Sequence, residues 1–130
     1  MPPSPEEILR AEEEEVARLE REERDQEAWK SLRAKHGKGR VALIQTPMGA
    51  IIMRVQTLAE QDAGGQRINA LENETDRLSV VRETTLDCVV YPSREDARKV
   101  TDAFPGLWVR LFQARDALSV GESERLTGKA

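Results

Sequence analysis

The chain has little of the residues from which many sites and scaffolds are built. Its 130 residues include one cysteine and one histidine, and only 4% are aromatic. A single cysteine, Cys88, cannot form an internal disulfide, and with His36 as the only imidazole the usual ligands of a zinc site are missing. The composition therefore excludes a disulfide-stabilised scaffold and a zinc centre, and we expect no cofactor.

A long apolar run is also missing. No stretch approaches the roughly 18 consecutive apolar residues of a membrane-spanning helix. The N-terminus opens Pro-Pro-Ser-Pro-Glu-Glu, without a basic flank before an apolar run. We expect no contact with a membrane and a location in the cytosol or in an assembly. At about 100–200 residues per domain, this length allows one modest core plus an appendage, which excludes a large two-domain enzyme.

Charge is plentiful but unevenly distributed. The sequence carries 24 acidic and 20 basic side chains, for a formal net charge of −4. Nearly every second residue from Glu6 to Glu27 is acidic, whereas the two signs balance further along the chain. This shift predicts an acidic helical arm at residues 1–36, a mixed domain at residues 40–121 and a polar tail at residues 122–130.

The arm has a strong helix start. Ser4 can cap the helix, Pro5 suits its first position, and Glu7 completes a Ser-x-x-Glu capping box. A helix to about Ala34 would be on the order of 45 Å long at roughly 1.5 Å per residue. Its apolar residues are sparse, and residues 20–27 offer nothing to bury. We expect the arm to project, to dock on a partner or to fray, and the domain to fold without it.

The domain opens with the pattern of a β-hairpin. Segments 40–46 and 50–56 are rich in β-branched residues and flank a Thr-Pro-Met-Gly turn. An isolated hairpin is marginally stable, so its apolar face must pack on helices or on another chain. A capping box at residues 57–60 begins a helix, which the glycines at residues 64–65 are expected to interrupt.

Helical spacing dominates the rest of the domain. Apolar residues recur from Gln66 to Tyr91, and this periodicity favours helix even though residues 84–91 could form a strand by composition. Further helices are predicted over residues 94–103 and 107–119, the second stopped by Gly121. The predicted class is thus a mainly helical α+β fold with a long N-terminal acidic helix, one β-hairpin and then three to four helices.

Candidates for catalysis are few. His36 lies at a helix end beside glycine and lysine. A cation that interacts with the free carbonyls of the helix end is a simpler interpretation of this histidine than a general base. Cys88 lies on an apolar stripe with no cationic neighbour in sequence to activate it, which favours a structural thiol. Segment 37–40 lacks the frame of a phosphate-binding P-loop. We therefore expect the protein not to be an enzyme.

A short basic cluster raises the question of nucleic-acid binding. It comprises Lys30, Arg33, Lys35, Lys38 and Arg40. Several basic residues together can bind a phosphate backbone. The net charge, the acidic run beside the cluster, the lack of helix-turn-helix or zinc-finger spacing and the few aromatics all argue against this function.

Two groups of residues are candidates for binding a protein partner. The last predicted helix places four large side chains close together: Leu107, Trp108, Leu111 and Phe112. The acidic arm carries three more: Val16, Leu19 and Trp29. Each group has an alternative, because an apolar helical stripe is usually core and a charged helix is usually a solvated surface.

Several short motifs resemble those of a known family. They are the hairpin at residues 40–54, the Thr-Leu-Ala-Glu helix start at 57–60, Val-Val-Tyr-Pro at 89–92 and Phe-Pro-Gly-Leu at 104–107. Over residues 40–119 the chain resembles tail assembly chaperones of long-tailed bacteriophages and related baseplate-hub assembly chaperones. The resemblance implies a noncatalytic role in the host cytoplasm. Such a protein binds the tape-measure or tail-tube proteins and keeps an aggregation-prone helical chain soluble until the tube polymerises.

A second hypothesis is a structural subunit. In a phage particle or a related contractile assembly, the arm would dock along neighbouring virion subunits and the domain would fill a site in a symmetric lattice. A chaperone leaves before the particle matures, whereas a structural subunit stays at fixed stoichiometry. The sequence also leaves self-association of the chain open.

Overall fold

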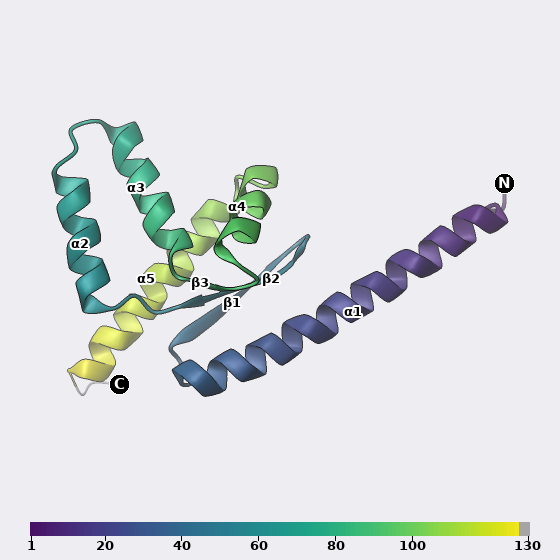
Figure 1. Ribbon diagram of the computed structural model, residues 1–130, viewed down its shortest axis with the longest axis horizontal. Coiled ribbons are helices and arrows are strands. Elements are labelled where there is room, and N and C mark those ends of the chain that lie inside the picture. Colours follow the sequence, from purple (N-terminus) through teal and green to yellow (C-terminus); the bar gives the residue numbers. More distant parts are fainter. Residues whose placement is uncertain (128–130) are drawn as a thin grey trace.

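Residues 1–127, which the computed structural model describes, form five helices and one three-stranded antiparallel sheet (Figure 1). The helices are α1 (Pro5–His36), α2 (Leu58–Asn69), α3 (Glu74–Leu86), α4 (Arg94–Ala103) and α5 (Leu107–Leu126), and the strands are β1 (Val41–Thr46), β2 (Gly49–Arg54) and β3 (Val89–Tyr91). The predicted class, a mainly helical α+β fold with a long N-terminal helix and a hairpin, is confirmed.

Helix α1 begins and ends where its local sequence predicts. The Ser4 hydroxyl accepts a hydrogen bond from the Glu7 amide at 3.2 Å, which satisfies one of the free donors at the helix start. Gly37 ends the helix with φ at +99°, and its amide donates to the Arg33 carbonyl. The whole acidic arm is therefore one uninterrupted helix.

The hairpin turn is equally local in origin. Thr46 pairs with Gly49 at the end of the ladder, and the Thr46 hydroxyl accepts from the Met48 amide at 3.1 Å. Gly49 has φ at +114°, a backbone conformation that residues other than glycine rarely adopt. The β1–β2 hairpin is confirmed.

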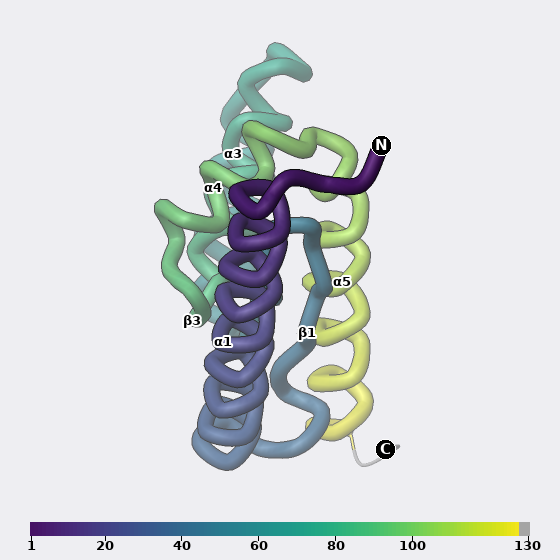
Figure 2. Tube along the Cα trace, turned by 90° about the vertical axis from the view of Figure 1, so that its right-hand side faces the viewer, coloured from purple at the N-terminus to yellow at the C-terminus, as the bar shows by residue number. Residues whose placement is uncertain are grey.

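The sheet lies between α1 and α5, with β1 visible between them in Figure 2. Side chains alternate across a strand, so Ile51 and Met53 face α5 and join the main core with Leu111. Ala50 and Ile52 point to the other face, where α1 contacts both β1 and β2. Ile52 is fully buried, so the arm helix closes the second face of the sheet.

The continuous helix expected from residue 66 to Tyr91 is wrong in two places: the chain leaves the helix between Asn69 and Glu74, and its last residues form a strand. Asn73 starts α3 by accepting a hydrogen bond from the Thr75 amide at 2.7 Å, and the helix ends at Leu86. Residues 89–91 then form β3, which pairs antiparallel with β2. Pairing with β2 satisfies backbone groups of this segment and overrides its helical periodicity.

The expected helix interruption at residues 64–65 and the expected helix end at Gly121 are both wrong. Helix α2 runs through Gly64 and Gly65. A Cβ at Gly64 would lie at an ordinary van der Waals distance, 3.6 Å, from the Thr84 side chain of α3, so α2 packs beside α3 at this position. Helix α5 passes Gly121 and continues to Leu126. The predicted polar tail is therefore helical over residues 122–126, and residues 128–130 lie outside the described part of the chain.

Candidate functional site

The predicted partner-binding residues of α5 belong to the core. Leu107, Trp108 and Leu111 are 7%, 9% and 0% exposed. Phe112 is half-buried and stacks on Trp108 with the ring centroids 5.6 Å apart. The Arg82 guanidinium covers the Trp108 ring at 5.3 Å. The expectation that these side chains form a surface is therefore corrected in favour of the core alternative.

Helix α1 has two halves with different surroundings. In the distal half, residues 5–20, every residue is exposed. In the proximal half, residues 21–36, one stripe is shielded by the sheet. The stripe consists of Arg21, Asp25, Ala28, Trp29, Leu32 and His36, which recur every three to four residues. The proximal half is thus docked along one side, whereas the distal half extends beyond the domain (Figure 1).

The most buried residue of α1 is a carboxylate. Asp25 is 7% exposed and accepts two hydrogen bonds, from the Ala50 amide at 2.9 Å and from the Tyr91 hydroxyl at 2.6 Å. Burial and this hydrogen bond raise the pKa of Tyr91 to about 12, so the phenol stays a donor at neutral pH. Asp25 therefore joins α1 to both β2 and β3, in a stretch from which the sequence predicted nothing to be buried.

The remaining contacts of the proximal half are close and partly apolar. A Cβ at Gly49 would lie 3.0 Å from the Arg21 side chain and 3.3 Å from an Asp25 oxygen, so α1 packs directly on the hairpin end. Trp29 is half-buried and borders a small hollow with Leu43 and Gln45 of β1. The structure thus uses Trp29, a predicted partner-binding residue, largely within the fold.

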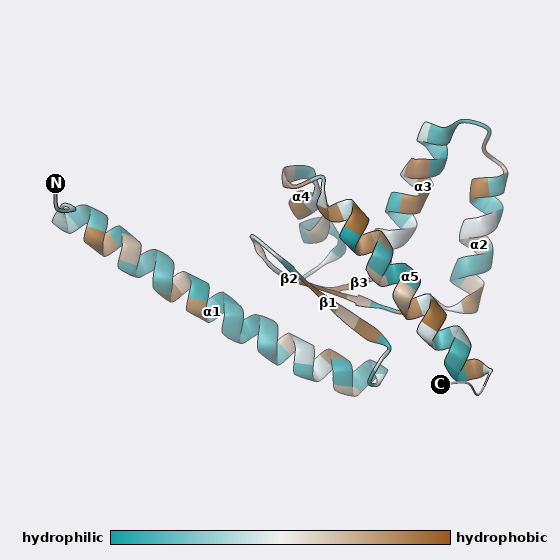
Figure 3. Cartoon of the chain, turned by 180° about the vertical axis from the view of Figure 1, so that it is seen from behind, coloured by the Kyte–Doolittle hydropathy of each residue, from teal (hydrophilic) through white to brown (hydrophobic). Residues whose placement is uncertain are grey.

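The distal half carries apolar side chains that nothing covers within residues 1–127. They are Ile8, Leu9, Val16 and Leu19, with exposed fractions of 46%, 56%, 54% and 51%. We call these four residues the distal apolar stripe. Figure 3 shows α1 as a mostly hydrophilic helix with a few apolar positions along it. Two of the residues predicted to bind a partner, Val16 and Leu19, are therefore on the surface, and the structure adds Ile8 and Leu9 beside them.

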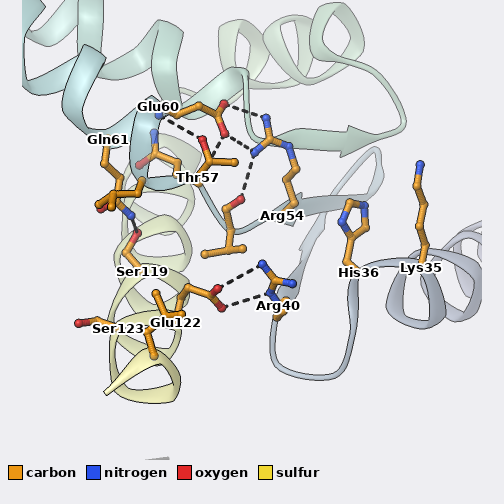
Figure 4. Close-up of a pocket in the computed structure, with 14 residues that line it drawn as sticks. Lys35, His36, Arg40, Arg54, Thr57, Glu60, Gln61, Ser119, Glu122 and Ser123 are labelled. Carbon is orange, nitrogen blue, oxygen red and sulfur yellow. Dashed lines mark hydrogen bonds and ion pairs between the residues drawn. The ribbon is translucent and has the colours of Figure 1, made fainter. Parts of the chain in front are cut away.

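A polar pocket of about 650 Å³ lies at the other end of α1, between the β2–α2 connection and the end of α5 (Figure 4). Arg54 makes two parallel hydrogen bonds to Glu60, at 2.7 and 2.9 Å. The bonds from Arg54 hold the pKa of Glu60 at about 2. Arg40 pairs with Glu122 at 3.2 Å. Both arginines facing the pocket are thus engaged by carboxylates of the chain.

The two residues considered for catalysis lie in different surroundings. Burial, with the nearby charges of Lys35, Arg54 and Arg40, lowers the pKa of His36, which disfavours the helix-end cation expected at this position. Burial raises the pKa of the Cys88 thiol to about 11, which keeps it protonated. The histidine borders the pocket and the cysteine lies in the core, so the fold does not bring them together as a nucleophile and base.

Sequence reasoning missed Asp25 and the outward direction of the distal apolar stripe. Asp25 looks like any other acid of the arm, and only the hairpin opposite it gives it partners. The direction of the stripe could have been found by placing the arm on a helical wheel. Proximal apolar residues Trp29 and Leu32 then fall on one side and the distal apolar stripe falls roughly opposite them, since successive residues are about 100° apart.

Over residues 1–127 no helix is both long and apolar enough to cross a membrane, and no group of three or more histidine, cysteine, aspartate or glutamate side chains is placed to hold a metal ion. Comparison of the chain with protein-family models, with curated proteins and with solved structures finds no match.

Proposed function

We propose that this protein is a noncatalytic tail assembly chaperone of a long-tailed bacteriophage, which binds a tape-measure or tail-tube protein through helix α1. The observation that carries the proposal is the distal half of α1. It extends beyond the domain as a continuous helix and keeps four large apolar side chains about half exposed. Exposed apolar side chains grouped on one side of a helix are typical of a surface that a partner covers.

The architecture suits a protein that presents a binding helix. The proximal half of α1 is fixed to the sheet by Asp25 and Trp29, so the distal half is held in a defined direction. A pre-oriented helix loses less conformational entropy on binding than a free segment would. The separation of His36, at the pocket, from the buried and protonated Cys88, in the core, supports a noncatalytic role.

The test is co-expression of the full chain with the tape-measure and tail-tube proteins from the same source. We expect the chain to copurify with one of them and to increase the fraction that stays soluble. Leu19→Asp should reduce this recovery several-fold, because it places a charge in the distal apolar stripe. Ala17→Asp is the matched control, since Ala17 is exposed and lies about 160° around the helix from Leu19.

Mass spectrometry of purified mature particles separates the proposal from a structural subunit. A chaperone should be absent from the particles, whereas a structural subunit would be present at a fixed copy number. If the protein is present in mature particles and neither client is recovered with it, the proposed function is contradicted. Its partners would then be sought among neighbouring virion subunits.

A further inference from the structure

The charges of α1 are segregated around the helix. Because successive residues are about 100° apart, the distal apolar stripe occupies one side. Glutamates lie within that side and along both of its edges: Glu12, Glu15, Glu20, Glu22, Glu23 and Glu27. The arginines of the same stretch lie outside the apolar stripe: Arg10, Arg18, Arg21 and Arg24. Two of them reach its edges, since Arg24 borders Glu20, Glu23 and Glu27 and Arg18 pairs with Glu15 and Glu22. We call the stripe with these six glutamates the acidic–apolar face.

This face is open except at one edge, where Glu22 borders the hollow beside Leu43 and Gln45 of β1. All six glutamates are exposed, and the face lies roughly opposite the side of α1 that packs on the sheet. Arg18 reaches one edge, where it pairs with Glu15 at 2.6 Å and with Glu22 at 2.9 Å. The ion pairs recorded within residues 1–127 do not include Glu12, Glu20, Glu23 or Glu27. The face therefore carries an excess of negative charge beside its apolar residues.

A second copy of the chain fits this face poorly. Glu12 stands at the centre of the stripe and the other glutamates follow or border it, so pairing two such faces would oppose carboxylates to carboxylates. Arg18 and Arg24 reach only the edges of the face, so the repulsion at its centre would remain. Like charges opposite one another across a helix pair are destabilising.

We propose that the acidic–apolar face binds one amphipathic helix rich in lysine and arginine, supplied by the client protein. This inference rests on the proposed function and names the class of segment that α1 recognises. The apolar side chains of the client helix would pack between those of the distal apolar stripe, ridges into grooves. Its lysine and arginine side chains would reach the glutamates on either side. Salt at physiological concentration largely screens charges more than about 8 Å apart, so these closer pairs would still attract each other.

The dimensions of the face set the size of the client segment. From Ile8 to Leu19 the stripe extends about 17 Å at 1.5 Å per residue, or roughly three helical turns. Glutamates continue along the same side to Glu27, where the docked proximal half begins to hold α1 in place. A client helix of about four to five turns would cover both the apolar and the purely acidic part.

Fluorescence anisotropy with designed peptides tests this inference on the full chain. The probe is a labelled helical peptide of about five turns, with leucines on one side and lysines around them. One comparison peptide replaces the lysines by glutamates, and another keeps the composition but spreads the leucines around the helix. We expect the basic amphipathic peptide to bind at least about tenfold more tightly than either comparison, with an affinity that falls as salt rises.

Variants of α1 locate the contact. Leu19→Asp should weaken binding of the basic amphipathic peptide about tenfold, even though it adds negative charge to the protein. Ala17→Asp adds the same charge away from the face and should leave the affinity unchanged or slightly stronger. Equal binding of the ordered and the spread peptide, or equal affinity of both variants, would overturn the inference. So would a dimer in sedimentation equilibrium that Leu19→Asp dissociates, because a second copy would then cover the face.

The peptide and client experiments distinguish failure of this inference from failure of the proposed function. If a client is recovered with wild-type and Leu19→Asp protein alike and the basic peptide does not bind, the proposed function stands on another surface and this inference is wrong. If the peptide binds as expected but neither tail protein is recovered, the class of segment is supported and the assignment to tail assembly is wrong.

Discussion

The two halves of α1 have similar sequences but different roles. Both are dominated by charged residues, and the distal half has more aliphatic side chains than the proximal half. Nevertheless the proximal half is the one that packs on the sheet, through Asp25, Trp29 and Leu32, while the distal half stays exposed. Apolar content therefore did not decide which half belongs to the domain.

The position of each half relative to the hairpin decided which half of α1 packs on the domain. Asp25 lies where an amide of β2 and a hydroxyl of β3 both need an acceptor. A buried carboxylate with two donors is stabilised there, whereas an apolar residue would leave the donors unpaired. The distal half has no sheet beside it, so its apolar side chains remain available to another molecule.

Truncation gives the largest expected contrast between the halves. Removing residues 1–36 should lower the free energy of unfolding by about 3–5 kcal/mol, because Ile52 and its face of the sheet lose their cover. Removing only residues 1–20 should change it by less than about 0.5 kcal/mol. Urea unfolding followed by circular dichroism measures both. Coincident curves for the two truncations would show that the docked half contributes nothing, as the sequence alone suggested.

Substitution of single acids should reproduce the contrast at smaller scale. Asp25→Ala is expected to cost about 2–3 kcal/mol of unfolding free energy, since the Ala50 amide and the Tyr91 hydroxyl lose their acceptor. Glu14→Ala removes a carboxylate from the exposed distal half and should have almost no effect. Thermal unfolding of the two variants and the wild type compares them directly. An equal loss in both would mean that Asp25 acts only through its charge.

The contact between α1 and the hairpin end can be tested at Gly49. Gly49→Ala should destabilise the protein by about 1–2 kcal/mol, because φ is +114° and the added Cβ would meet Arg21 at 3.0 Å. Gly65→Ala is the control: this glycine is in a helix with nothing within 4 Å, and alanine should stabilise by about 0.5–1 kcal/mol. Denaturant midpoints measure both changes. Opposite signs are expected, and two changes of the same sign would contradict the role of Gly49.

The partly buried ion pair of Arg54 and Glu60 at the pocket should affect stability at low pH more than an exposed ion pair on α1 does. Arg54 lowers the pKa of Glu60 from 4.5 to about 2. A lowered folded-state pKa means that the stabilisation is complete above about pH 4.5 and is lost as the pH falls towards 2. Because the pair is about one-third exposed, we expect a loss of only about 1 kcal/mol.

The control for this pH dependence is the exposed pair of Arg18 and Glu22 on α1, which joins the end of the distal half to the start of the proximal half. Glu60→Gln should flatten the decline in unfolding free energy between about pH 5 and 2, a range from just above the ordinary pKa of Glu60 down to its pKa in the folded protein. Glu22→Gln should leave the decline as in the wild type, because an exposed pair contributes little. The same slope in all three proteins would show that the Arg54–Glu60 pair is not stabilising.

Prediction from sequence succeeded where the signal was local. The start of α1 at Ser4, the hairpin turn at residues 46–49 and the start of α4 at Ser93 each depend on a side chain that bonds to a backbone amide two or three residues away. Such signals need no knowledge of the rest of the chain. The same reasoning failed at Gly64 and Gly121, where glycine lies inside a helix rather than at its end.

The failures at α5 and β3 have a tertiary cause. Trp108 and Leu111 have the same pattern whether a partner or the core covers them, and only the packing of α5 on the sheet decides between the two. Residues 89–91 form a strand because β2 offers an unpaired edge at that point. Both outcomes depend on segments that are distant in sequence.

The sequence by itself determined the long capped helix, the hairpin and the helical character of the rest, because capping, turn geometry and periodicity act over a few residues. It also determined that the glutamates and the distal apolar stripe share one side of α1, because the helix repeat fixes that arrangement. Only the tertiary structure decided that Asp25 is buried, that β3 joins the sheet and that Trp108 is core. Hydrogen-bond partners and solvent shielding come from distant parts of the chain, and they exist only after the sheet and helices have packed together.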